Sequence, residues 1–222
     1  MICESPLHRP ALPRPLYRPL ALPLLICFAL AVFAMLPTQI FRLLQAEALP
    51  WLLADYGGRL LALGVLLVHP AGRWVLSQPC GLKVGKSEAL IWILAIVVLL
   101  RLSGIDAWLA ALLPQTRLGA YPAPQGALYF FDLGIGLALV ALHEEVVFRQ
   151  MASQALSRFL ASDLAVTLAS AVIFALYHWW TGIGNMLAAL LFGLVAMPCY
   201  RRCGSLWPVG IAHYILDLWA FA

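Results

Sequence analysis

Seven stretches of this chain are almost purely apolar and approach the length needed to cross a lipid bilayer. A spanning helix needs about 20 mainly apolar residues, and a soluble domain is charged at about a quarter of its positions. Only 11% of the 222 residues are charged and 64% are hydrophobic. The sequence therefore predicts an all-α, polytopic transmembrane bundle of about seven spans, within a range of six to eight. The stretches are 20–36, 51–68, 89–102, 128–147, 164–180, 186–200 and 206–221.

The longest break between apolar stretches covers residues 103–126 and contains Pro114, Pro122 and Pro124. It separates an N-terminal group of three spans, within residues 1–102, from a C-terminal group of four, within 128–222. The remaining connections are too short for a soluble domain. We therefore treat residues 1–222 as a single membrane domain.

The basic residues of the chain are scattered rather than gathered into one patch, so no nucleic-acid partner is indicated. Ten of the 14 Lys and Arg residues fall on the side of the membrane that holds the N-terminus, against Arg42 and Arg117 on the other side. Cytoplasmic loops are enriched in these residues. The pattern predicts an integral protein of the cell (inner) membrane, surrounded by lipid, with its N-terminus in the cytoplasm. The ten residues are Arg9, Arg14, Arg18, Arg73, Lys83, Lys86, Arg149, Arg158, Arg201 and Arg202.

Charged residues within the apolar stretches are costly in a bilayer, so each one needs either a partner or a function. Asp55 and Arg59 lie four residues apart in the second stretch, and an ion pair along one helix accounts for both. Asp132 lies near the outer end of the fourth stretch and has no evident partner. We expect its side chain to reach the membrane interface.

The densest polar cluster closes the fourth stretch with His143, Glu144, Glu145 and Arg149. Glu145 and Arg149 share a helical face and can form an ion pair. Glu144 projects about 100° away from them, which leaves its carboxylate free. The cluster is either a solvated helix end among the lipid headgroups or part of a buried site.

The next apolar stretch ends near His178 and favours the buried site. Glu144 precedes Ala161, at the centre of the intervening break, by 17 residues, and His178 follows Ala161 by the same number. In an antiparallel hairpin the two side chains would lie level, about 25 Å from the turn. We therefore expect Glu144 and His178 to meet inside the bilayer.

The last stretch contributes His213 and Asp217, which lie four residues apart on one helical face. They could satisfy each other, or they could face a cavity shared with Glu144 and His178. Carboxylates and imidazoles from three spans form a set suited to general acid–base chemistry. We expect Glu144, His178, His213 and Asp217 to converge on one cavity.

These residues form three ordered motifs within residues 128–221. Together the motifs resemble those of the CAAX protease and bacteriocin-processing family of intramembrane peptidases. The motifs are Glu144-Glu145-x-x-x-Arg149, Phe174-x-x-x-His178 and His213-x-x-x-Asp217.

The resemblance implies an endopeptidase that hydrolyses a membrane-associated or lipidated protein or peptide substrate. Glu144 would activate the attacking water and His178 would help to hold it, while His213 and Asp217 would stabilise the oxyanion. The structural support of the site would come from Glu145, Arg149 and Phe174.

One residue departs from the pattern of the prenyl-protein-processing members, in which the last position is often Asn and here is Asp217. An ionised Asp cannot donate a hydrogen bond to an oxyanion. It would have to be protonated, orient His213 or bind a metal. A metal-free, glutamic-type site is favoured, because a Glu beside a water in a low-dielectric cavity is a plausible general base. Zinc is the alternative, although the chain has no HExxH motif.

Two other functions would also explain buried polar residues. A proton-coupled membrane transporter buries Glu, His and Asp, but the halves of this chain show no repeat of hydropathy such as many transporters have. A catalytically inactive immunity or scaffold protein of the same family would tolerate the loss of a motif. All three motifs are recognisable here, so peptidase activity is preferred.

Overall fold

A computed structural model describes residues 20–78, 85–102 and 104–222, and every regular element within these ranges is a helix. The predicted all-α class is therefore confirmed for this part of the protein. Four basic residues of the topology pattern lie outside the described residues: Arg9, Arg14, Arg18 and Lys83.

The N-terminal group begins with α1 (Ala21–Phe33), which leads into α2 (Leu36–Leu43). Helix α3 (Ala48–Val68) returns alongside both of them, and α4 (Pro70–Leu76) follows it. The close approach of α3 depends on Gly58, because a Cβ atom there would lie 2.3 Å from Oγ1 of Thr38.

Helix α5 (Lys86–Val97) continues as a π-helical stretch, Val98–Leu102, and is followed by α6 (Ile105–Ala111). A loop then leads to a long helix that contains two π-helical stretches. Its parts are α7 (Ala127–Phe131), a π-helical stretch (Asp132–Gly136), α8 (Leu137–Glu145), a second π-helical stretch (Val146–Met151) and α9 (Ala152–Leu156). The apolar stretch predicted to end at residue 147 is thus extended to Leu156. π-Helical turns of this kind are frequent at functional sites.

Three further helices complete the fold: α10 (Asp163–Tyr177), α11 (Ile183–Cys203) and α12 (Trp207–Phe221). Ser162 caps α10, since its Oγ accepts a hydrogen bond from the backbone N–H of Ala165 at 3.1 Å. Gly204 ends α11 in the left-handed conformation, with φ of 61°.

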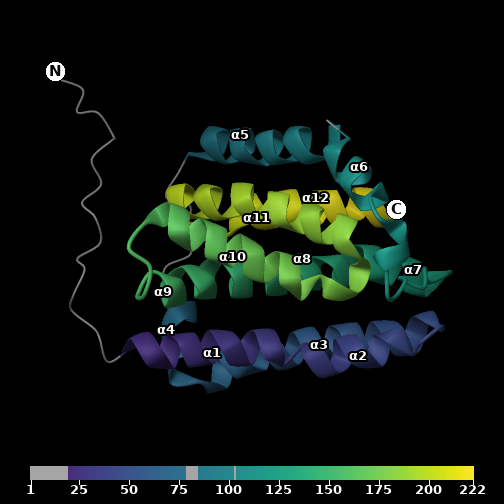
Figure 1. The fold of residues 1–222 in the computed structure, drawn as a ribbon, viewed down its shortest axis with the longest axis horizontal. Helices are drawn as coiled ribbons and strands as arrows, with labels where there is room; N and C mark the ends of the chain where they lie inside the picture. Colours follow the sequence, from purple (N-terminus) through teal and green to yellow (C-terminus); the bar gives the residue numbers. More distant parts are fainter. Residues whose placement is uncertain (1–19, 79–84, 103) are drawn as a thin grey trace.

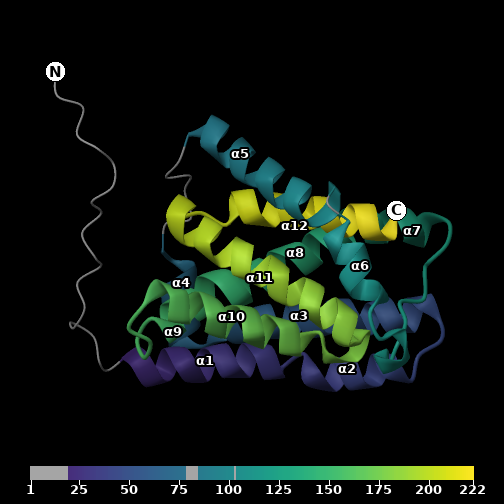
Figure 2. The same cartoon turned by 45° about the horizontal axis from the view of Figure 1, so that its top comes forward.

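The long helices run roughly along the longest axis of the molecule (Figure 1). Helices α1, α2 and α3 form one side of the bundle, α5 lies on the opposite side, and α8 to α12 lie between them. The turned view shows the same arrangement, with α6 crossing beside α11 (Figure 2). The motif-bearing helices α8, α10 and α12 therefore lie between the N-terminal helices and α5.

Charged side chains lie inside this bundle, and large apolar side chains cover much of its outside. This distribution reverses that of a soluble protein and suits a lipid environment. The buried charged residues include Arg42, Asp55, Arg59, Asp132, Glu144, Glu145 and Arg149. The exposed apolar residues include Leu22, Phe33, Leu67, Val68, Phe130, Ile135 and Leu164. The protein is accordingly an integral membrane protein.

Each of the seven predicted apolar stretches lies largely within helix. Three helical stretches of the described residues are long and apolar enough to cross a membrane: Ala21–Leu43, Ala48–Val68 and Ile183–Cys203. Helix α10 is apolar but shorter. The count of about seven spans stays a prediction.

Candidate active site

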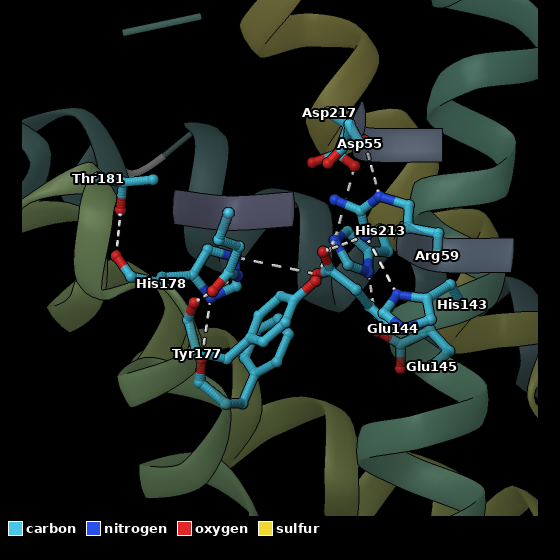
Figure 3. A network of polar contacts seen from close by, with 12 residues as sticks. Asp55, Arg59, His143, Glu144, Glu145, Tyr177, His178, Thr181, His213 and Asp217 are labelled. Carbon is cyan, nitrogen blue, oxygen red and sulfur yellow. Dashed lines mark hydrogen bonds and ion pairs between the residues drawn. The ribbon is translucent and has the colours of Figure 1, made fainter. Parts of the chain in front are cut away.

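Three helices bring the four candidate catalytic side chains together inside the bundle (Figure 3). Oε2 of Glu144, on α8, lies 3.9 Å from Nε2 of His178 and 3.7 Å from Nε2 of His213. His213, on α12, lies one helical turn from Asp217, with 3.6 Å between Nε2 and Oδ2. Each of the four side chains thus lies within 4 Å of another member of the set.

Glu144 and His178 meet because of the turn between α9 and α10. The chain leaves helix after Leu156 and re-enters it at Asp163, so the two helices form an antiparallel hairpin around Ala161. Residues at equal distances from the turn then lie level. The second π-helical stretch lies between Glu144 and the turn, and His178 follows the last residue of α10.

The ring orientation of each histidine is set by its second nitrogen. Nδ1 of His178 lies 2.8 Å from the carbonyl oxygen of Phe174, one turn earlier on α10. Nδ1 of His213 lies 2.8 Å from Oε1 of Glu145. A carbonyl and a carboxylate can only accept, so each Nδ1 carries a proton and each Nε2 faces Glu144.

Arg149 supports the site from one turn beyond Glu145. Its Nε lies 3.1 Å from Oε2 of Glu145, so the predicted ion pair is present, and both side chains are buried. The guanidinium lies over the ring of Phe174 at 4.6 Å and over that of Phe192 at 5.2 Å. Cation–π contacts of this kind are stronger away from water.

The expectation that Glu144 has a free carboxylate is wrong. Nη1 of Arg59, on α3, donates a hydrogen bond to Oε1 of Glu144 at 2.7 Å. The sequence pairs Arg59 with Asp55 alone, because Glu144 lies 85 residues further along the chain. A solvated helix end is likewise wrong, since Glu144 is only 2% exposed and Glu145 only 1%.

Arg59 is part of a longer chain of buried charges. Its Nε donates to Oδ2 of Asp55 at 2.8 Å, so the predicted i,i+4 pair is present. The other oxygen of Asp55 accepts from Nη1 of Arg42, on α2. The Arg42 guanidinium lies 4.6 Å from the ring centre of Trp51 and 4.7 Å from that of Trp180. Charges of alternating sign thus lead from Arg42 to Glu144.

The expectation that Asp132 reaches the membrane interface is also wrong. Asp132 is 2% exposed, and its two carboxylate oxygens accept hydrogen bonds from the hydroxyl groups of Tyr56 and Tyr121. Two tyrosines that are distant from each other in the sequence thus supply the hydrogen-bond donors that this buried carboxylate needs. Asp132 therefore links α3 to the segment before α7 and has no contact with Glu144 that would place it in the site.

The site meets the molecular surface beside two of its members. The side chain of His178 is 23% exposed and that of Asp217 is 20% exposed, whereas that of Glu144 is 3% exposed. Of the four side chains, those of His178 and Asp217 are thus the most exposed.

The donor set also bears on metal binding. Among residues 20–78, 85–102 and 104–222, no group of three or more His, Cys, Asp or Glu side chains is arranged as a metal site. Glu144, His178, His213 and Asp217 have the ligand chemistry that zinc prefers and would be the residues to hold it.

Comparisons with known proteins address the identity of this segment. A family model described as "Type II CAAX prenyl endopeptidase Rce1-like" matches residues 124–219, which contain all three motifs and exclude Arg59. No curated protein and no solved structure matches the chain. Residues 124–219 are therefore similar to the Rce1-like type II CAAX prenyl endopeptidases, in agreement with the resemblance of the three motifs to the CAAX protease and bacteriocin-processing family.

Proposed function

We propose that this protein is a CAAX-type intramembrane endopeptidase that hydrolyses a membrane-associated or lipidated protein or peptide with a water activated by Glu144. The observation that supports this most is the placement of Oε2 of Glu144 between the Nε2 atoms of two histidines, at 3.9 and 3.7 Å. These separations exceed a direct hydrogen bond and suit a bridging water.

The first step is proton transfer from that water. Nε2 of His178 accepts one hydrogen bond from the water, because the proton of this ring is on Nδ1, facing Phe174. Oε2 of Glu144 takes the other proton as the water oxygen bonds to the substrate carbonyl carbon. The carbonyl oxygen becomes an oxyanion, and Glu144 becomes neutral.

The second step breaks the peptide bond. His213, held by Glu145 through Nδ1, turns Nε2 toward the oxyanion and, when protonated on both nitrogens, donates to it. Glu144 then returns its proton to the leaving nitrogen. One water is consumed, giving a carboxyl and an amine, and Glu144 ends ionised as it began.

Asp217 lies 3.6 Å from Nε2 of His213. In the metal-free mechanism that we favour, its carboxylate attracts the His213 imidazolium and orients the ring. In the zinc alternative, Asp217 would be a ligand together with the histidines.

The same proposal places the protein in the cell (inner) membrane with a cytoplasmic N-terminus. The excess of Lys and Arg in the connections predicted to lie on the same side of the membrane as the N-terminus supports this orientation. The exposed edges of His178 and Asp217 then give a membrane-bound peptide its way to Glu144.

The test is cleavage of membrane-anchored peptides by the purified protein, followed by mass spectrometry. We expect Glu144→Gln to lower kcat by at least about a hundredfold, the contribution that a general base typically makes. The variant should still insert into the membrane and fold. Glu88→Gln is the matched control, since Glu88 is a partly exposed carboxylate on α5 that pairs with Arg202. Near-normal turnover by Glu144→Gln would rule out Glu144 as the base.

A further inference from the structure

Arg59 lies outside the family-matched residues 124–219, yet it makes the shortest polar contact of Glu144 that the structure describes. It is on α3, in the N-terminal group of helices, and is only 6% exposed. A buried cation in a membrane bundle needs anionic partners. Arg59 has two of them, Asp55 and Glu144.

The guanidinium is held in a defined orientation. Nε binds Oδ2 of Asp55 at 2.8 Å, while Nη1 reaches Oε1 of Glu144 at 2.7 Å and Nδ1 of His143 at 3.1 Å. Asp55 is itself fixed by Arg42. The planar guanidinium of Arg59 therefore donates to the two carboxylates from different nitrogen atoms, Nε and Nη1. The single ammonium nitrogen of a lysine cannot reproduce this arrangement.

The two oxygens of Glu144 consequently have different surroundings. Oε1 accepts from Arg59, whereas Oε2 faces His178 and His213. Rotation of the carboxylate would exchange the oxygens only by breaking the Arg59 contact. A guanidinium remains protonated in proteins, so Arg59 cannot itself take the proton from water.

We infer that Arg59 is a positioning residue: it holds Oε1 of Glu144 so that Oε2 faces the histidines, and it keeps the buried carboxylate ionised. This inference rests on the proposed function for its catalytic consequence. The ion pair itself is independent of that function.

The kinetic test compares Arg59→Gln, Arg59→Lys and Arg201→Gln in the peptide-cleavage assay. Arg59→Gln should lower kcat by about a hundredfold, the loss that a misplacement of about 1 Å can cause, with KM changed by less than about threefold. Arg59→Lys should restore part of the rate, because it keeps a cation beside Glu144 but cannot keep both contacts.

Arg201→Gln is the matched control. Arg201 also joins two helices, since Nη2 lies 2.6 Å from Oδ1 of Asp163, but it has no contact with the site. It should keep the kcat of the unmodified protein. Thermal unfolding in detergent identifies the folded variants, and if Arg59→Gln does not fold, Arg59→Lys decides.

Two kinetic outcomes overturn the inference. One is a folded Arg59→Gln, or in its absence Arg59→Lys, with a kcat within about twofold of the unmodified protein. The other is a raised KM with unchanged kcat, which would make Arg59 a substrate-binding residue.

A second measurement needs no turnover. A hydrophobic carbodiimide labels protonated carboxyl groups in membrane proteins, and a buried carboxyl that loses its cation takes up a proton. Mass spectrometry should show several-fold more label on Glu144 in Arg59→Gln than in the unmodified protein or Arg201→Gln. Unchanged labelling in a folded variant overturns the inference. If the unmodified protein cleaves no peptide, the proposed function fails, while the labelling still decides the role of Arg59.

Discussion

Nδ1 of His213 lies 2.8 Å from Oε1 of Glu145, and the other oxygen of Glu145 lies 3.1 Å from Nε of Arg149. One carboxylate thus connects an arginine of the central helix to a histidine of the last helix. The sequence pattern predicts the Glu145–Arg149 pair but not the contact with His213. Glu145 fixes the tautomer of His213 as well as neutralising Arg149.

Removal of Arg149 should destabilise the protein. Arg149→Ala leaves Glu145 buried without its cation, and breaking a buried pair in this way typically costs about 3–5 kcal/mol. Thermal unfolding in detergent should show a clear fall in Tm. Arg202→Ala is the control, because Arg202 is 63% exposed and its pair with Glu88 is 3.4 Å long. That change should alter stability by less than about 1 kcal/mol, and equal losses in the two variants would contradict a special role for Arg149.

Asp217→Asn separates the two catalytic mechanisms. In a metal-free site the variant should keep substantial activity, because the amide oxygen can still accept from His213 and the amide NH2, unlike a carboxylate, can donate to the developing oxyanion. In a zinc site the loss of a ligand should cost about tenfold or more in metal affinity or activity. Activity is measured with and without exhaustive chelation, alongside metal analysis of the unmodified protein. Stoichiometric zinc, chelator-sensitive turnover and an inactive variant would together reverse the preference for the glutamic type.

Gly193 permits the close packing of α11 against α10. A Cβ atom at this position would lie 2.9 Å from Cα of Ala171, so Gly193→Ala must push the two helices apart. Such overpacking costs about 1–3 kcal/mol and should lower Tm. Gly64→Ala, on α3, meets no atom within 4 Å and should leave Tm unchanged or raise it. A Gly193→Ala protein as stable as the unmodified one would show that the helices separate without loss.

Tyr56→Phe and Tyr121→Phe each remove a hydroxyl donor from buried Asp132. Each change should cost about 1–3 kcal/mol, because it leaves a charged acceptor less satisfied. Denaturant unfolding of the single and double variants measures the cost. Tyr129→Phe serves for comparison, since its hydroxyl donates to the terminal carbonyl of Ala222 in an exposed position, and it should change stability by about 0.5 kcal/mol or less. If all three single variants lost only about 0.5 kcal/mol or less of unfolding free energy, the two tyrosine hydroxyls would not be needed to stabilise buried Asp132.

Contacts within one helix or one hairpin follow from the sequence, because spacing and a short turn determine which residues meet. The i,i+4 pairs Asp55–Arg59 and Glu145–Arg149 are of this kind, and so is the level placement of Glu144 and His178. Residue spacing within the helices and the position of the break after Leu156 are sufficient for these predictions.

Contacts between distant helices do not follow in the same way. A membrane helix is apolar on most of its faces, so its sequence does not specify its rotation about its own axis. The sequence therefore does not predict that Arg59 on α3 faces Glu144. Nor does it predict that Tyr56 and Tyr121 approach Asp132. The π-helical stretch Val146–Met151 also has no signal in the apolar pattern. The one available clue was the presence of Arg59 itself in an apolar span.

The position of Arg59 on α3 limits how far the protein can be treated as modular. A chimera that joined residues 124–219 to foreign N-terminal helices would retain every motif residue but lose the cation that Glu144 contacts. Such a graft would need an arginine introduced at the same depth on the host helix, with a carboxylate one turn before it. Exchange of the N-terminal helices is thus constrained at the level of Arg59 and Glu144, where the two groups of helices share a buried pair of charges.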